Sequence, residues 1–212
     1  SGRTVLCVGH NDTPRWVMHD GTTRVRLNGE PVNQMARIGT FSEFVVCPAE
    51  QVIRIREDLP FTHAAIIGCS VATGVGAVIR HARVAAGDSV LVIGCGGVGL
   101  NVVQGARLAG ARTIIACDLL DNKLAYAKNF GATHTINAKL GDVVMRVQAL
   151  TGGLGVDVAF DAIGGEATAL QALDAVAPSG SPGRRILLDP GGRVFDQALA
   201  RVFPEFSRSR LQ

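Results

Sequence analysis

The sequence is poor in lysine and has no cluster of charges of one sign. Three of its 21 basic residues are lysines, the net charge is +3 over 212 residues, and the arginines are interleaved with acidic residues. This distribution argues against a polybasic arm, so nucleic acid is not an expected partner. With 47% apolar and 18% charged residues, the composition is that of a globular protein and not of a disordered or collagen-like chain.

No apolar run is long enough to predict a membrane span. The most apolar stretch, Ala64 to Ile79, is interrupted by glycine, serine and threonine and falls short of the roughly 20 residues that a span needs. We therefore expect a soluble protein without a membrane partner.

Cys-x-x-Cys pairs are also missing. The five cysteines are odd in number and widely spaced, which suits a reducing compartment and predicts buried thiols for most of them. The chain begins with Ser1 and nothing resembles a secretory signal, so we expect either a removed leader or a start further upstream. A cytoplasmic location follows as an expectation.

The first sixty residues have the pattern of a β-rich segment, in which turn signals such as Asn28-Gly29 and Pro48 separate short extended runs. The expected runs are Val5–Val8, Arg24–Leu27, Phe41–Cys47 and Gln51–Ile55.

From Thr62 onward the pattern changes to helices that alternate with apolar strands, which is typical of βαβ units and a parallel sheet. The expected helices are Val71–Ala82, Gly97–Ala109, a helix marked by Leu120, Leu124 and Ala127 and ended by Gly131, Leu140–Leu150 and Glu166–Val176. The expected strands are Ser89–Ile93, Thr113–Cys117, His134–Ile136, Val156–Asp161 and Arg185–Leu188. The arginine-rich, lysine-free segment after Ala177 predicts little regular structure beyond that last strand and a helix at Asp196–Val202.

The strongest motif is Gly-x-Gly-x-x-Gly between a predicted strand and a predicted helix that begins at Gly97. Gly94 permits a tight turn, Gly96 lets a pyrophosphate approach the backbone, and Gly99 lets the helix pack on the strand. The start of the helix offers N–H groups and the positive end of its dipole to the phosphates.

An acidic residue follows at the spacing that dinucleotide sites use. Asp118 lies nineteen residues after Gly99, just past the second strand. A carboxylate there accepts hydrogen bonds from the ribose hydroxyls and repels a 2′-phosphate, which favours NAD over NADP. Lys123 could reach the same ribose. The alternatives are a helix-capping Asp118, a solvated Lys123, and the glycine loop of a Rossmann-like methyltransferase.

Several motifs in order carry a family resemblance. The runs Gly39–Phe44, Gly68–Ala77 and Gly94–Gly99, followed by Asp118, make the chain resemble the zinc-dependent medium-chain alcohol dehydrogenases over roughly Cys7 to Ala177. The resemblance implies an α/β fold, with a Rossmann-type doubly wound parallel sheet and a β-rich remnant of a GroES-like catalytic domain. The domains implied are 1–61 for the remnant and 62–212 for the NAD-binding part, with 178–212 as an atypical tail.

The resemblance also implies roles for individual residues. Cys69 would be a ligand of the catalytic zinc, Thr73 would contact the nicotinamide, Val98 would pack behind it, and Ile163 would lie beside that half of the cofactor. Geometry agrees for Cys69, because a helix of about 13 residues and a returning strand of about 6 each cover near 20 Å. Cys7 would be a remnant of a structural zinc site. Without the family, Cys69 is more simply a small buried thiol.

The activity implied is the oxidation of an alcohol, or the reduction of an aldehyde, by zinc-assisted hydride transfer to or from NAD. The remaining zinc ligands and the catalytic residues are expected upstream of Ser1, so the chain is interpreted as a fragment that is inactive alone. The alternatives are a dinucleotide-binding or degenerate protein without zinc, and a zinc-free medium-chain reductase.

After Ala177 the pattern of the family is lost, which suggests a truncated or frame-shifted coding sequence. The edge of the sheet that would pair in a dimer falls in this region. We therefore expect a homo-oligomer if that C-terminal edge is intact.

Overall fold

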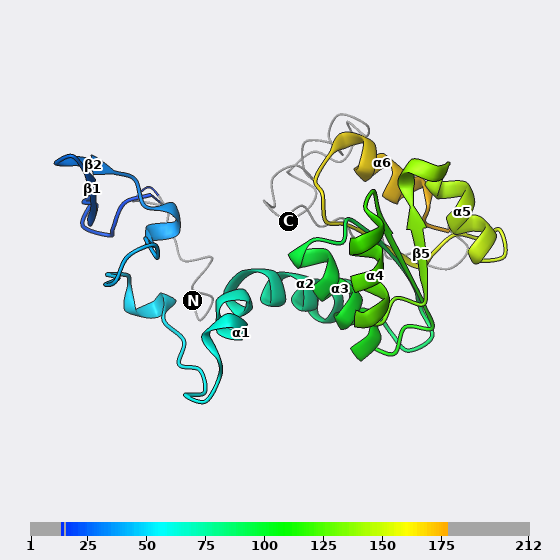
Figure 1. Cartoon of the computed structure of the whole chain (residues 1–212), viewed down its shortest axis with the longest axis horizontal. Coiled ribbons are helices and arrows are strands. Elements are labelled where there is room, and N and C mark those ends of the chain that lie inside the picture. The colour runs from blue at the N-terminus through cyan, green and yellow to red at the C-terminus, as the bar shows by residue number, and fades with distance from the viewer. Residues whose placement is uncertain (1–13, 15, 178–212) are drawn as a thin grey trace. The chain divides into compact units, whose positions relative to one another are not determined.

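The computed structural model describes residue 14 and residues 16–177, and the chain divides into two compact units at Leu59 and Pro60 (Figure 1). The first unit contains one β-hairpin, β1 (Val25–Leu27) with β2 (Glu30–Val32). Its turn places Asn28 and Gly29 at φ 51° and 88°. Positive φ at both central residues is the requirement of a type I′ turn, which the Asn-Gly pair satisfies.

The strands expected at Phe41–Cys47 and Gln51–Ile55 are not formed. The second run holds only the end of a 3-10 turn, Ala49–Gln51. Within the described part of this unit no neighbouring strand lies beside either run, so an extended conformation would gain no ladder of hydrogen bonds. Their apolar residues are exposed, as Phe44 shows at 88%. The run Val5–Val8 and the predicted elements after residue 177 lie outside the described residues.

The second unit opens with one long helical run, Phe61–Ala82, built from α1 (Phe61–Ile66), a π-helical segment, α2 (Ala72–Gly76) and a second π-helical segment, Ala77–Ala82. It begins ten residues before the predicted start, directly after Pro60. In the second π-helical segment Ala77 is buried and Ile79 is exposed.

By length and composition alone this run of 22 residues could cross a membrane. This run is longer than Ala64 to Ile79, the apolar stretch on which the prediction of no membrane span was based. Its second half packs in the manner of a core helix, because a Cβ built on Gly74 would lie 2.6 Å from the Val98 carbonyl oxygen of the neighbouring helix. One such helix is weak evidence for a membrane, and the absence of a membrane partner stays a prediction.

In the described part of this unit, four parallel strands form a sheet in the order β5-β4-β3-β6. The strands are β3 (Ser89–Ile93), β4 (Thr113–Asp118), β5 (His134–Asn137) and β6 (Val158–Asp161). Strand order reverses beside β3, since β4 and β5 lie on one side of it and β6 on the other. This is the doubly wound arrangement expected from the sequence, and its switch point lies between β3 and β6.

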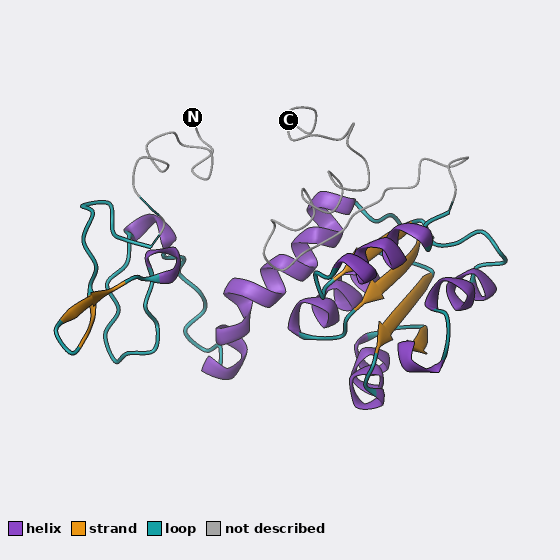
Figure 2. Ribbon diagram, turned by 90° about the horizontal axis from the view of Figure 1, so that it is seen from above, coloured by secondary structure: helices purple, strands orange, loops and turns teal. Residues whose placement is uncertain are grey.

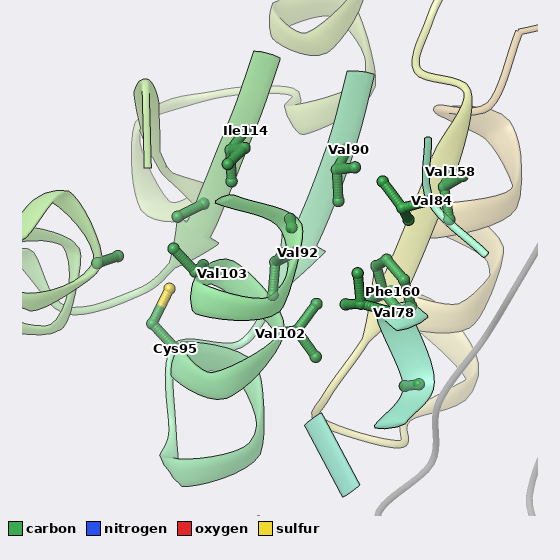
Figure 3. Packing of buried hydrophobic residues seen from close by; sticks show 14 of the residues in the cluster. Val78, Val84, Val90, Val92, Cys95, Val102, Val103, Ile114, Val158 and Phe160 are labelled. Atoms are coloured by element: carbon green, nitrogen blue, oxygen red, sulfur yellow. The ribbon is translucent and has the colours of Figure 1, made fainter. Parts of the chain in front are cut away.

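Helices cover both faces of the sheet (Figure 2). The connecting helices are α3 (Gly97–Leu108), α4 (Asp121–Phe130), α5 (Val143–Leu150) and α6 (Glu166–Asp174). Side chains of β3 alternate between two buried clusters. Val90 and Val92 join the cluster with α3 (Figure 3), and Leu91 and Ile93 join the one with α5 and α6. A strand with apolar residues on both faces is what a buried parallel sheet requires.

Three predicted boundaries are wrong by a few residues. Leu140 lies in a 3-10 turn before α5 and is exposed, so it does not extend the apolar stripe of that helix. Val156 precedes β6 and forms an isolated bridge with Val176, which itself lies beyond the end of α6. The remaining strands and helices of the second unit occupy the predicted segments.

Phe160 tests the buried core of the sheet. Its ring is fully buried in the same apolar cluster as Val78 and Val92, so Phe160→Ala should lower the free energy of unfolding by about 3–5 kcal/mol. Phe61→Ala is the matched control, because Phe61 is 91% exposed and its loss should change stability by no more than about 0.5 kcal/mol. Urea denaturation followed by circular dichroism measures both, and equal losses would contradict the packing described.

Candidate functional site

The turn between β3 and α3 accepts glycine alone at two positions. A Cβ built on Gly99 would lie 1.7 Å from the Gly94 carbonyl oxygen, and one built on Gly94 would lie 2.6 Å from Cγ1 of Ile163. Gly94 also has a φ of 93°, in the left-handed region that glycine adopts without strain. These close approaches bring the start of α3 directly onto the end of β3.

Gly96 has the opposite surroundings. No protein atom lies within 4 Å of a Cβ built on it, and its φ of −82° suits any residue. Gly96 is the N-cap of α3, whose first-turn N–H groups have no intrahelical partners, and no side chain caps them. The open space beside this glycine therefore faces a cluster of backbone donors and the positive end of a 12-residue helix.

Asp118 lies at the carboxyl end of β4, next to this turn. Its Oδ2 accepts a hydrogen bond from the Cys95 N–H at 2.8 Å, and its Oδ1 accepts one from the Leu120 N–H at 3.1 Å. The carboxylate is 9% exposed, and two carboxylate oxygens offer about four acceptor positions, so acceptor capacity remains for a ligand. Lys123 Nζ lies 4.0 Å from Asp118 Oδ2, which places a cation beside the same carboxylate.

The long helix reaches the turn from the other side. A Cβ built on Gly97 would lie 3.3 Å from Ser70 Cβ, so the expected return of this helix to the glycine turn is observed. Cys69 and Thr73 therefore lie on helical turns near the start of α3, Cys69 exposed and Thr73 half-buried, while Val98 is half-buried against the core. Their roles in binding stay predictions.

The residues that the structure describes do not form a zinc site. Cys69 is a free thiol, and among the residues that the structure describes no group of three histidine, cysteine or acidic side chains could hold a metal. A structural zinc takes four protein ligands and a catalytic one three. Cys7, the predicted remnant of a structural site, lies outside the described residues. The glycine turn with Asp118, by contrast, fits a dinucleotide.

Cys95 and Cys117 behave as the buried thiols predicted from the sequence. Cys95 Sγ lies 3.7 Å from the Cys117 carbonyl oxygen, and Cys95 belongs to the same apolar cluster as Val103 (Figure 3). Burial, followed by the nearby charge of Asp118, raises the pKa of each thiol to about 12. Neither is a nucleophile at neutral pH.

Sequence reasoning missed one carboxylate at this site. Asp161 ends β6 and is 3% exposed, and it accepts hydrogen bonds from the loop that follows it. The available signal was an acidic residue at the end of the predicted strand Val156–Asp161.

Comparisons with known proteins agree with this geometry. Residues 97–182 match the sequence model of a family described as zinc-binding dehydrogenase. An S-(hydroxymethyl)glutathione dehydrogenase of Paracoccus denitrificans is 45% identical over 168 residues, 78% of this chain and 44% of that protein. An alcohol dehydrogenase class-3 of Cereibacter sphaeroides is 40% identical over 184 residues, 82% and 49% of the two chains.

Solved structures show the same likeness. An alcohol dehydrogenase zinc-binding domain protein from Burkholderia ambifaria aligns with a TM-score of 0.71 at 31% identity, covering 91% of this chain and 60% of that one. Benzyl alcohol dehydrogenase from Acinetobacter calcoaceticus aligns with a TM-score of 0.68 at 27% identity, covering 82% and 55%.

Fold and site together define a dinucleotide-binding α/β domain of the doubly wound type. The comparisons confirm the particular resemblance, to the zinc-dependent medium-chain alcohol dehydrogenases. The chain spans about half the length of the curated relatives it matches.

The two glycines at the turn give contrasting predictions of stability. Gly99→Ala forces a methyl group onto a backbone oxygen, so we expect a loss of at least about 3 kcal/mol, the upper end for overpacking. Gly96→Ala adds a methyl group in open space at an N-cap, and we expect a change within about 1 kcal/mol. Thermal unfolding of both variants against the wild type measures this, and a well-folded Gly99→Ala would show that the turn is wrongly described.

Proposed function

We propose that this chain forms the NAD-binding part of an oxidoreductase that oxidises a small alcohol or reduces an aldehyde. The observation that carries the proposal is the Asp118 carboxylate, hydrogen-bonded at 2.8 Å to the backbone N–H of Cys95 within the glycine turn. One residue thereby joins the phosphate-binding turn to the ribose-binding position of a dinucleotide site.

Each part of the site has a part of the cofactor to bind. The pyrophosphate would lie in the open space at Gly96 and accept hydrogen bonds from the first-turn N–H groups of α3. The adenosine ribose would donate its two hydroxyls to Asp118, with Lys123 beside them. The charge of Asp118 would repel a 2′-phosphate, so the proposal specifies NAD and not NADP.

When bound, NAD supplies the carbon that accepts or returns a hydride. The residues of this chain bind and orient it: Ile163 and Thr73 would border its nicotinamide half. The described residues hold no set of zinc ligands, so the zinc of the intact enzyme would require ligands beyond Cys69.

The class of substrate is supported by the names of the relatives. Those most similar over this segment are called S-(hydroxymethyl)glutathione dehydrogenase and alcohol dehydrogenase class-3. We propose a small alcohol or aldehyde, a thiol adduct of formaldehyde among them, as the substrate. The proposal also includes a cytoplasmic location, supported by the four free cysteines of the described residues, and a homo-oligomer without nucleic-acid or membrane partners.

A second candidate is a dinucleotide-binding protein without metal or turnover. Cys69 favours it, because this thiol has no partner set within the described residues. Metal analysis of the product expressed with all flanking coding sequence separates the candidates. About two zinc ions per chain supports the first, by analogy with a catalytic and a structural site, and none supports the second.

Asp118 should control which nucleotide binds. Wild type is expected to bind NADH well and NADPH poorly, whereas Asp118→Asn removes a charge-assisted pair and should weaken NADH about tenfold or more. The same variant should bind NADPH more tightly than wild type does, because the repulsion of the 2′-phosphate is gone. Isothermal titration calorimetry measures the dissociation constants of wild type and Asp118→Asn for NADH and for NADPH.

Asp121→Asn is the matched control for Asp118, since it removes the same charge three residues along, at the exposed start of α4. It should leave both affinities unchanged. The proposed function fails if wild type binds no NADH, or if Asp118→Asn binds NADH and NADPH as wild type does.

The chain alone should not oxidise alcohols. With zinc, NAD and a primary alcohol or S-(hydroxymethyl)glutathione present, we expect no NADH production above the protein-free rate, while NADH binding persists. Absorbance at the NADH band measures turnover, and calorimetry on the same sample measures binding. Zinc-dependent NADH production by this polypeptide would show that the 212-residue chain suffices for catalysis.

A further inference from the structure

A buried carboxylate at the end of β6 accepts three hydrogen bonds, two from the loop that follows it and one from Thr168. Asp161 Oδ1 accepts hydrogen bonds from the N–H groups of Ile163 at 2.9 Å and Gly164 at 3.3 Å, and Oδ2 accepts one from Thr168 Oγ1 at 2.8 Å. The side chain is 3% exposed. A buried charge is stable only with such partners, so carboxylate and loop fix each other.

Thr168 closes the same loop from its other end. Its hydroxyl oxygen accepts a hydrogen bond from the Gly165 N–H at 3.2 Å. Its one hydrogen has two acceptors within reach, the Asp161 carboxylate at 2.8 Å and the Gly165 carbonyl at 3.0 Å. The charged and nearer acceptor is favoured. The Asp161–Thr168 pair therefore holds residues 162–165 from both sides, and we call it the β6 clasp.

The clasped loop lies directly on the glycine turn. The Ala162 N–H donates to the Ile93 carbonyl at 2.8 Å, and Ile163 Cγ1 would be 2.6 Å from a Cβ on Gly94. Ile163 is nevertheless 53% exposed. Its side chain thus touches the turn and also borders open space beside it.

Strand order decides which half of a dinucleotide this loop would meet. Asp118 follows β4, on one side of β3, and the clasped loop follows β6, on the other side. A dinucleotide in a doubly wound sheet crosses the switch point with its pyrophosphate at the glycine turn. With the adenosine on the Asp118 side, the other half extends toward Ile163.

We propose that the β6 clasp is a positioning device for the nicotinamide half of the cofactor, and that Asp161 is its positioning residue. This inference rests on the proposed function. The clasp fixes the backbone at Ile163 and Gly164 before the ligand arrives, so the wall beside the nicotinamide is ordered in the free protein and no ordering entropy is lost there on binding.

Asp161→Ala tests the clasp with two ligands that differ in the nicotinamide alone, NADH and ADP-ribose. We expect Asp161→Ala to bind NADH at least about tenfold more weakly, because the loss of one charge-assisted hydrogen bond has about that effect. Its affinity for ADP-ribose should change by less than about twofold. The nicotinamide fluorescence of any NADH that binds should differ from its value in wild type. Calorimetry and fluorescence titration give both readouts.

Conservative variants separate positioning from general damage. Asp161→Asn keeps an oxygen for the Ile163 N–H and a donor for the Thr168 oxygen, so it should restore NADH affinity to within about threefold of wild type. Thr168→Ser should match wild type, and Thr168→Val should weaken NADH selectively. If Asp161→Ala does not fold, the comparison of Thr168→Ser with Thr168→Val tests the proposal by itself.

Asp157 supplies the matched control near the opposite end of the same strand. Its Oδ2 accepts hydrogen bonds from the backbone N–H and the hydroxyl of Ser89 at 2.7 and 2.6 Å. Asp157→Ala should therefore lower thermal stability and leave both ligand affinities unchanged.

Two results would overturn the inference while the proposed function stands: equal weakening of NADH and ADP-ribose by Asp161→Ala, or unchanged binding of both. A wild-type protein that binds neither ligand would overturn the proposed function and the clasp together.

Discussion

The contact between Gly99 and the Gly94 carbonyl sets the geometry on which the site depends. A Cβ at Gly99 would lie 1.7 Å from that oxygen, so α3 can approach β3 only where the side chain is a hydrogen atom. This approach aims the start of α3 at the space beside Gly96. A helix start held further away would present the same N–H groups to bulk water, which would satisfy them and compete with an anion.

Two carboxylates flank this turn and use their acceptors differently. Asp118, on the β4 side, accepts hydrogen bonds from two backbone N–H groups, which leaves acceptor positions for a ligand. Asp161, on the β6 side, is more deeply buried, and its oxygens accept hydrogen bonds from its own loop and from Thr168. Both carboxylates lie at the end of a strand. Asp118 is the more exposed of the two and is available to a ligand, whereas Asp161 orders the loop that forms the wall of the site. Asp118 bonds the backbone of the glycine turn itself, whereas Asp161 bonds the loop that lies against that turn.

The sequence predicted the second unit well because its signals are local. The buried strand Ser89–Ile93, the glycine turn and the left-handed ending of α4 at Gly131 depend on residues next to one another. The first unit was predicted poorly because strands need partners. Phe41–Cys47 has the composition of a strand, yet Phe44 is 88% exposed and no described neighbour pairs with this run. Asp161 was missed for a related reason, since its role depends on Thr168, seven residues away across a loop.

Cofactor binding and alcohol oxidation need not reside in the same residues. The elements that would bind a dinucleotide, from β3 through α6, lie within one unit whose core is continuous on both faces of its sheet. Cys69 lies on an exposed turn of the helix that opens this unit. A tetrahedral metal needs ligands that the described residues do not bring to it. Binding therefore requires only the packing of this unit, whereas polarising a substrate oxygen requires a second set of ligands held against it. A chain with this structure can retain the first property without the second.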